Sequence, residues 1–258
     1  MKAMKKVKFL LWIFLILGVV TSCQAQSRKA TAQQPSYKIW NDLLHEYIND
    51  QGLVNYKGFI KDSAKLNVFL HGLSTHAPDP AKWSKDQRMA FWINAYNAFT
   101  VKLIIMHYPV KSIKDIGPKI QIYKISTPWQ IKFFSIGSRK INLDDIEDKI
   151  LRKEFDDPRI HFALVCAALS CPPLRNEAYT PDKLNAQLND QGRKFLSQTF
   201  KNKISANKIE LSSIFKWYKG DFTKQQSLIS FLNRFAPVKI DPDASISYIN
   251  YDWDLNKQ

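Results

Sequence analysis

Apolar residues recur at helical spacing along much of the chain. Residues three and four positions apart share one face of a helix, so a repeat of apolar residues at this spacing indicates a buried helical face. The pattern predicts helices over 40–48, 66–73, 184–200 and 228–235. The first of these contains Trp40, and each of the four has at least four apolar residues on one face.

Capping signals refine where the helices begin. Ser84-Lys85-Asp86-Gln87 is a capping box, and it predicts a long helix that ends near His107, before a proline. Asn142 is a candidate cap for a short helix with acidic residues early and basic residues late. Thr180-Pro181 and the capping box Thr223–Gln226 predict two further helix starts.

Shorter alternating stretches predict strands. The stretch 129–143 contains a Gly-Ser turn and predicts a β-hairpin, and 204–211 predicts a second hairpin. Residues 245–253 alternate like a strand, and 159–166 is an apolar run that predicts a buried strand. Helices interspersed with hairpins predict the α+β class, as a single domain with helices packed around a mainly antiparallel sheet.

The N-terminus has the pattern of an export signal. Four lysines precede FLLWIFLILGVV, which begins at Phe9 and is too short to span a membrane as a helix. The following Val20-Thr21-Ser22-Cys23 resembles the lipobox of bacterial lipoproteins, in which the cysteine after the cleavage site carries the lipids. Ordinary cleavage after Ala25, which would release a soluble periplasmic or secreted protein, is the alternative.

We therefore predict a signal peptide over 1–22, a lipidated Cys23, a polar tether over 23–36 and one domain over 37–258. The mature protein is then expected in the cell envelope, anchored to a membrane by its lipid. With 45% apolar and 13% aromatic residues, the domain has enough apolar material for one sizeable core.

The charge of the mature chain narrows the class of partner. Four of the 38 basic residues and none of the 23 acidic ones precede Cys23, which leaves a net charge of +11. An exported protein does not meet chromosomal DNA, so we expect no nucleic-acid partner. The expected partners are the membrane, anionic envelope polymers or another envelope protein. No glycine-rich phosphate loop and no HExxH motif occurs, so no cofactor or metal is expected.

Candidate chemistry gathers in RIHFALVCAALSCPPLR, residues 159–175. Side chains alternate along a regular strand, so His161 and Cys166 are expected on opposite faces. Cys171 lies beyond the predicted strand, next to two prolines, and could return toward His161. The sharpest hypothesis is therefore Cys171 as a nucleophile, His161 as its base and Glu147 as the group that orients the imidazole.

Other interpretations of the two cysteines compete with this one. A nucleophilic thiolate needs a positive or hydrogen-bonding neighbour, which Arg159 or Arg175 could supply. Cys166 and Cys171 could instead form a disulfide in an oxidising compartment, or remain two reduced structural thiols. Metal binding is a further alternative, although the five-residue spacing matches no zinc pattern.

Five motifs, in this order, resemble bacterial members of the domain of unknown function 547 family, over about residues 37–256. They are FWINAYNAFTVKLI (from Phe91), INLDDIEDKILR (from Ile141), DPRIHFALVCAALSCPPLR (from Asp157), IFKWYKGDF (from Ile214) and YDWDLN (from Tyr251). The resemblance brings no assigned activity. It also implies a more distant similarity to papain-like and transglutaminase-like cysteine enzymes. This chain has Val165 and Asp148 where members of the family commonly have Asn, and His or Asn, respectively.

In those cysteine enzymes the nucleophile opens the central helix, and the histidine lies on a later strand. The matching helix here contains Asn94 and Asn97 but no cysteine, which implies either a permuted enzyme or a binding module without a nucleophile. The two amides share one helix face. They either cross-link the core to a loop or line a ligand cleft, because buried amides need partners.

Two functions follow from these observations. The first is an envelope binding or assembly domain, and the second is a thiol-dependent amide or acyl hydrolase or transferase using Cys171 and His161. Four aromatic residues near the C-terminus have a pattern more typical of a core than of a sugar-stacking site: Trp217, Tyr218, Tyr251 and Trp253.

Overall fold

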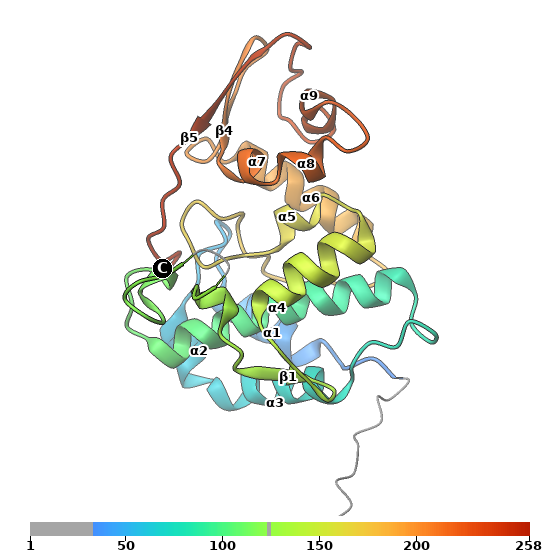
Figure 1. The fold of residues 1–258 in the computed structure, drawn as a ribbon, viewed down its shortest axis with the longest axis vertical. Coiled ribbons are helices and arrows are strands. Elements are labelled where there is room, and N and C mark those ends of the chain that lie inside the picture. Colours follow the sequence, from blue (N-terminus) through green and yellow to red (C-terminus); the bar gives the residue numbers. More distant parts are fainter. Residues whose placement is uncertain (1–32, 123–124) are drawn as a thin grey trace, which may run out of the picture.

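The computed structural model describes residues 33–122 and 125–258 (Figure 1). The predicted signal peptide, Cys23 and most of the predicted tether lie outside the described residues.

The first two thirds of the described chain form a helical body. Its elements are α1 (Lys38–Tyr47), α2 (Tyr56–Lys61), α3 (Ser63–Thr75), α4 (Lys85–His107), the 3-10 turns η1 (Ile113–Asp115) and η2 (Pro128–Gln130), strands β1 (Phe134–Ile136) and β2 (Arg139–Ile141), the π-helix η3 (Asp145–Phe155) and α5 (Ile160–Ala163).

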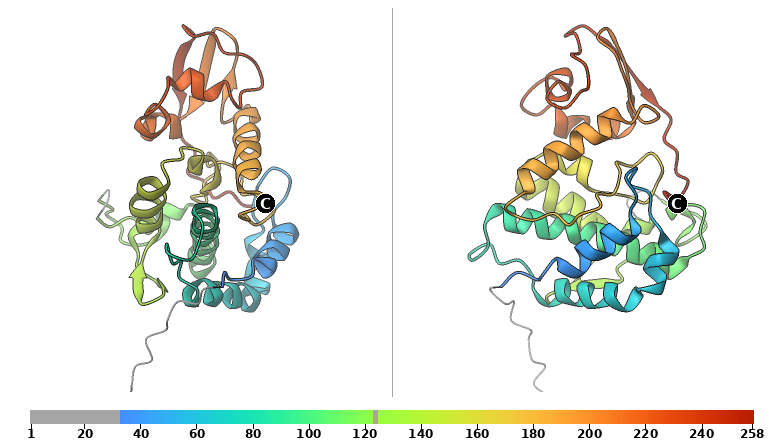
Figure 2. Two further views of the ribbon diagram at one scale, coloured as in Figure 1. Left: turned by 90° about the vertical axis from the view of Figure 1, so that its right-hand side faces the viewer. Right: turned by 180° about the vertical axis from the view of Figure 1, so that it is seen from behind.

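The rest of the chain builds a smaller C-terminal lobe above this body (Figure 1). It contains α6 (Leu184–Ser197), β3 (Lys203–Ile204), β4 (Lys208–Ser212), α7 (Ile214–Trp217), α8 (Lys219–Phe222), α9 (Leu228–Leu232) and β5 (Ser245–Ile249). Figure 2 shows α6 running from the body into the lobe.

Two small sheets accompany the helices. Strands β1 and β2 form the predicted hairpin, in which Phe134 pairs with Ile141. In the lobe, β4 lies between β3, which is antiparallel to it, and β5, which is parallel to it. The predicted α+β class is confirmed.

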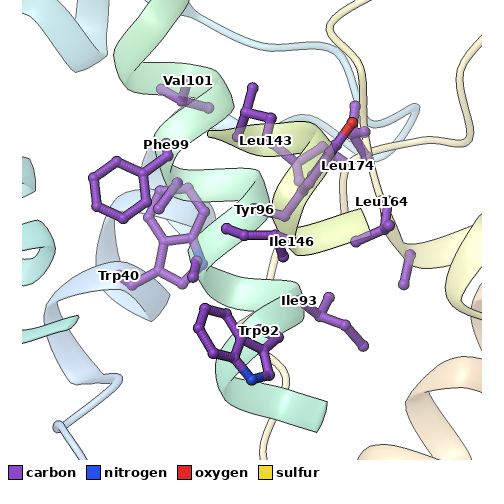
Figure 3. Packing of buried hydrophobic residues seen from close by; sticks show 14 of the residues in the cluster. Trp40, Trp92, Ile93, Tyr96, Phe99, Val101, Leu143, Ile146, Leu164 and Leu174 are labelled. Carbon is purple, nitrogen blue, oxygen red and sulfur yellow. The ribbon is translucent and has the colours of Figure 1, made fainter. Parts of the chain in front are cut away.

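Helix α4 is the centre of the body. Ser84 and Gln87 form the predicted capping box, and the helix ends at His107 as predicted. Side chains on all sides of it are buried, among them Ile93, Tyr96 and Phe99 (Figure 3). Within the described part of the chain, α4 is the helix long and apolar enough to cross a membrane, but most of it is buried inside the domain. A helix that is apolar all round is also what a central core helix requires.

Buried apolar residues form two clusters, one in the body and one in the lobe. Two helices join them. Ile160 and Ala163 of α5 lie in the body cluster, whereas Phe162 lies in the lobe cluster. Leu184 at the start of α6 belongs to the body, and Phe195 near its end belongs to the lobe.

The chain returns to the body after β5. Val54 N–H donates to the carbonyl of Asn256 at 2.8 Å, and the buried Tyr56 hydroxyl donates to the Asn256 side chain at 2.7 Å. Leu169 N–H donates to the carbonyl of Asp254 at 2.8 Å. This return brings Tyr251 and Trp253 back over the body, next to the loop that contains both cysteines.

The predicted strand over 159–166 is wrong. Residues 160–163 form the short helix α5, and the chain becomes extended only from Leu164. The cause lies just before the run. Asp157 Oδ1 accepts from the N–H of Arg159 at 3.0 Å, and Pro158 follows Asp157 directly. Ile160 N–H also donates to the carbonyl of Asp157 at 3.2 Å. The turn that Asp157 and Pro158 begin leads into α5 and overrides the strand pattern of the apolar run.

Two of the other predicted helix starts are also wrong. Residues 181–183 form a turn after Thr180, and α6 begins only at Leu184. The cap of α9 is Ser227, whose hydroxyl accepts from Ser230 N–H at 3.1 Å, rather than Thr223. The cap at Asn142 is confirmed, since its side chain accepts from Asp145 N–H at 2.7 Å.

Candidate functional site

A cavity of about 790 Å³ lies between the body and the C-terminal lobe. Besides Tyr96 of α4, five aromatic side chains line it, and we call it the aromatic cleft: Trp129, Trp217, Tyr218, Tyr251 and Trp253. Trp129 lies in η2, Trp217 ends α7, and Tyr218 follows it. Tyr251 and Trp253 lie in the segment that returns to the body after β5.

The aromatic rings contact one another. Trp217 is stacked on Trp253, with ring centroids 5.9 Å apart and planes 21° apart. Trp129 meets Trp253 edge-on at 5.8 Å, and Tyr251 lies 4.7 Å from Trp217. The Nζ of Lys114 lies 3.7 Å from the centre of the Trp253 ring, which is cation–π distance. Trp217 is 49% exposed. The other four rings are partly buried and pack against the two core clusters, so the aromatic surface is an edge of the core at which Trp217 opens to solvent.

His161 lies at one end of the cleft and is held by a carboxylate from the lobe. Its Nε2 is 2.7 Å from Asp221 Oδ2. An ionised carboxylate can only accept, so Nε2 is the donor. The imidazole is stacked on the Tyr218 ring at 4.0 Å and is 3% exposed. The body and the lobe are therefore joined here by a buried, charge-assisted hydrogen bond.

Arg152 completes this network. Its Nε donates to Asp221 Oδ2 at 2.7 Å, and a second nitrogen donates to Asp221 Oδ1 at 3.1 Å. The same guanidinium donates to Asp148 at 2.6 Å. Burial on its own raises the pKa of Asp221, but the hydrogen bonds from His161 and Arg152 outweigh it and hold that pKa well below its ordinary value.

Glu147 lines the cleft but does not orient the imidazole. Its Oε1 lies 4.0 Å from His161 Nδ1, too far for a hydrogen bond. The carboxylate that contacts the imidazole is Asp221 instead. Glu147 faces the hydroxyls of Tyr96 and Tyr218, and burial together with this carboxylate raises the pKa of both tyrosines.

The two cysteines form a disulfide in the wall of the cleft. Cys166 and Cys171 are bonded, with Cα atoms 6.2 Å apart, and both line the cavity. Cys166 N–H donates to Cys171 Sγ at 2.9 Å, and the Tyr251 hydroxyl donates to the same sulfur at 3.1 Å. Behind the disulfide, the buried Lys201 donates to the Cys171 carbonyl, and burial lowers the pKa of Lys201 to about 7.

The disulfide alternative for the two cysteines is thus the one present in the structure. His161 and Cys166 line the same cavity, and the expectation of opposite faces is wrong because α5 is not a strand. A sulfur bonded to another sulfur is not a free nucleophile. The nucleophilic role of Cys171 stays a prediction, and it applies to a reduced form of the protein.

The two arginines expected near the thiols are engaged elsewhere. Arg159 pairs with Asp157 and donates to two asparagines of α6. Arg175 pairs with Glu177 and Asp190. Neither lines the aromatic cleft, because each side chain is directed to acceptors on or near α6.

The amides of α4 cross-link the core to two loops, as one of the two alternatives predicted. Asn94 donates to the carbonyl of Tyr179 at 2.7 Å and accepts from its N–H at 3.0 Å. Asn97 donates to the carbonyl of Ala163 at 2.9 Å and accepts from Val165 N–H at 3.0 Å. Asn97 thereby fixes the backbone between His161 and Cys166.

No group of three or more His, Cys, Asp and Glu side chains in residues 33–122 and 125–258 is arranged to hold a metal ion. Other polar side chains also line the cleft: the carboxylates of Asp144, Glu147 and Asp148, the amide of Gln121 and the hydroxyl of Thr127.

Asp221 and Arg152 were not predicted as the partners that hold the His161 site. The predicted core position of the C-terminal aromatic residues fails for Trp217, which is exposed, whereas Tyr218, Tyr251 and Trp253 pack against the core clusters. One signal was available. Trp217, Tyr218 and Asp221 all fall within IFKWYKGDF, a single short motif that was used only for the family resemblance. A short motif that combines aromatic rings with a carboxylate is a reason to test for a ligand-binding site.

The comparison with known proteins gives a match for one part of the chain, which contributes one wall of the cleft. No curated protein and no solved structure gives a significant match to the chain, so the similarity to papain-like and transglutaminase-like enzymes stays a prediction. Residues 80–196 match a family model. They include α4, η3, α5 and the disulfide, whereas Trp217, Asp221 and Tyr251 lie outside the match. That model is described as protein of unknown function DUF547, so residues 80–196 are similar to this family.

Proposed function

We propose that this chain is an exported, lipid-anchored protein of the cell envelope whose domain binds carbohydrate in the aromatic cleft. The observation that carries the binding proposal is the open surface of stacked indole rings around a cavity of about 790 Å³. A ligand site is typically a concave, mostly apolar surface with a few polar groups that fix orientation, and the cleft has this composition.

A sugar ring matches this surface in shape and polarity. Its C–H face is apolar and packs on an aromatic ring, while its hydroxyls project around the edge. In the cleft, the half-exposed Trp217 offers a ring face, whereas Trp253 is stacked on Trp217 and contacted by Lys114. Glu147 and the side-chain oxygen of Gln121 offer acceptors at the cleft wall, where hydroxyls can be paired. Trp217 and the rings beside it form a continuous apolar surface, and such a surface rimmed by polar groups supports a ligand that covers it.

The charges of the cleft favour an uncharged sugar over the anionic polymers expected from the net charge. Asp144, Glu147 and Asp148 contribute negative charge to the lining. The guanidinium of Arg152 is already occupied by Asp148 and Asp221, and Lys114 lies on the Trp253 ring. A polyanion would therefore meet carboxylates without a free guanidinium to compensate for them.

Replacing Trp217 with alanine should weaken the binding of a neutral oligosaccharide by about tenfold or more. Losing a stacked ring face costs on the order of 1.4 kcal/mol, which corresponds to that factor. The test is calorimetric or fluorescence titration of the purified domain with a tetrasaccharide of N-acetylglucosamine. The fold should be unaffected, because Trp217 is 49% exposed.

Phe200→Ala is the matched control, because Phe200 is also an exposed aromatic residue, at 61%, but does not line the cleft. The affinity of this variant for the tetrasaccharide should equal that of the unmodified domain. A poly(glycerol phosphate) serves as the anionic comparison ligand. If the polyanion binds and the neutral sugar does not, or if both variants bind alike, the carbohydrate proposal is wrong.

The anchor is supported by the Lys-rich start, the short apolar stretch and the lipobox-like Val20–Cys23. Replacing Cys23 with serine should move the protein from the membrane fraction to the soluble fraction, because one cysteine would carry all the acyl chains. Fractionation with immunoblotting measures this. Equal membrane association of both forms would contradict lipid anchoring at Cys23.

A further inference from the structure

The disulfide is placed where a dissolved thiol can reach it. Cys166 is partly exposed and Cys171 is 2% exposed, yet both border the aromatic cleft. The two sulfurs therefore differ in access: an incoming group meets Cys166 first, while Cys171 lies deeper in the wall.

Two hydrogen-bond donors reach the disulfide. Cys166 N–H lies 2.9 Å from Cys171 Sγ and is directed at this sulfur, while the Tyr251 hydroxyl lies 3.1 Å from Cys171 Sγ and 3.2 Å from Cys166 Sγ, where it can follow whichever sulfur becomes charged. Burial raises the pKa of Tyr251, so its hydroxyl keeps its proton and remains a donor. Donors aimed at a sulfur stabilise the negative charge that appears when its disulfide bond breaks.

We infer that Cys166–Cys171 is a thiol–disulfide exchange site, which small-molecule thiols or cysteine-bearing peptides reach through the aromatic cleft. This inference does not rest on carbohydrate binding, because it depends on the sulfurs and Tyr251 rather than on the indole faces. It assigns a separate role to each cysteine, with Cys166 as the sulfur attacked and Cys171 as the leaving sulfur.

The reaction balances with two thiols as the reductant. A substrate thiolate attacks Cys166 Sγ, a new bond forms between the substrate sulfur and Cys166, and the Cys166–Cys171 bond breaks. Cys171 leaves as a thiolate, held by Cys166 N–H and the Tyr251 hydroxyl. A second substrate thiolate then attacks the substrate sulfur of the mixed disulfide, which releases Cys166 as a thiolate. The substrate thiols end as a disulfide, and the two cysteines take up the two electrons.

The first experiment measures whether the Cys166–Cys171 disulfide of the folded protein exchanges with a dissolved thiol. The purified domain, oxidised, is incubated with dithiothreitol at pH 7 without denaturant, and the free thiols are counted by alkylation and mass spectrometry. We expect reduction much faster than global unfolding measured in parallel. Tyr251→Phe should slow the reduction by about fivefold or more, because the leaving thiolate loses a donor. Tyr248→Phe, a partly exposed tyrosine on β5, is the matched control and should not slow it.

The second experiment separates the two sulfurs. The oxidised domain is treated with reduced glutathione and quenched by alkylation, and peptide mapping should find glutathione on Cys166 at least tenfold more often than on Cys171. Circular dichroism verifies that the domain stays folded during the reaction. The inference is overturned by reduction that occurs only at the rate of unfolding, by glutathione found mainly on Cys171, or by equal rates for Tyr251→Phe and the unmodified domain.

Discussion

Replacing Asn97 with alanine should lower the free energy of unfolding by about 4 kcal/mol. The Asn97 side chain is 3% exposed and is the partner of two buried backbone groups, the carbonyl of Ala163 and the N–H of Val165. Alanine leaves both groups unpaired, and each unsatisfied buried group costs roughly 1–3 kcal/mol. Chemical denaturation followed by circular dichroism measures the change.

Asn97→Asp distinguishes lost hydrogen bonds from lost volume. An aspartate keeps an acceptor for Val165 N–H, but its other oxygen faces the carbonyl of Ala163, which cannot donate. This variant should also be strongly destabilised, although its size is unchanged. Asn67→Ala is the matched control, because Asn67 is an exposed residue of α3 whose side chain accepts a hydrogen bond from Lys102. It should change stability by less than about 0.5 kcal/mol. Equal costs for Asn67→Ala and Asn97→Ala would show that the cross-link is unimportant.

Local patterns predicted the elements whose causes are local. The capping box at Ser84 fixes the start of α4, and the apolar residues that follow fix its length. The hairpin at β1 and β2 follows from a turn between alternating strands. In each case the residues that decide the structure are only a few positions apart, so the sequence shows the cause directly.

The error at 159–166 has a different origin. An apolar run of eight residues fits a buried strand or a short buried helix equally well, because both bury every side chain. The residues that determine the helix include two that lie before the run: Asp157 and Pro158 form the turn that leads into α5. That error then misplaced the sulfurs, because the expected separation of His161 and Cys166 depended on strand alternation.

The cleft was hidden from sequence reasoning because its two walls come from distant parts of the chain. His161 and Asp221 are 60 residues apart, and Tyr251 is 80 residues from Cys171. No periodicity encodes such pairings, since they arise only when the lobe folds back on the body. The sequence predicted one site from Cys171, His161 and Glu147, and all three line the cleft. Cys166 lines it too, although it was expected on the opposite face. Their actual partners required the structure.

Replacing Asp221 with alanine should lower the free energy of unfolding by about 3 kcal/mol at pH 7. Asp221 is the carboxylate that binds both His161 and Arg152, and it joins the lobe to the body. Its removal leaves a buried imidazole without its acceptor and frees one side of a guanidinium, and breaking a buried charge pair costs roughly 3–5 kcal/mol. We expect a loss at the lower end of this range, because Asp221 and Arg152 are each more than a quarter exposed and water partly replaces the lost partner. Denaturant unfolding at pH 7 measures the loss.

The pH dependence gives this prediction an independent test. In the folded protein, the pKa of Asp221 lies well below its ordinary value of 3.8. A carboxyl group with a lowered pKa stabilises the folded state above the unfolded pKa, and that stability is lost as the pH falls from about 3.8 toward the folded value. Asp221→Asn removes this carboxyl, so its stability should fall less steeply below pH 4 than that of the unmodified domain. Asp243→Asn removes an exposed carboxylate of the same lobe and should leave the slope unchanged. If Asp221→Asn and the unmodified domain lose stability in parallel on acidification, the link between the lobe and the body does not depend on an ionised Asp221.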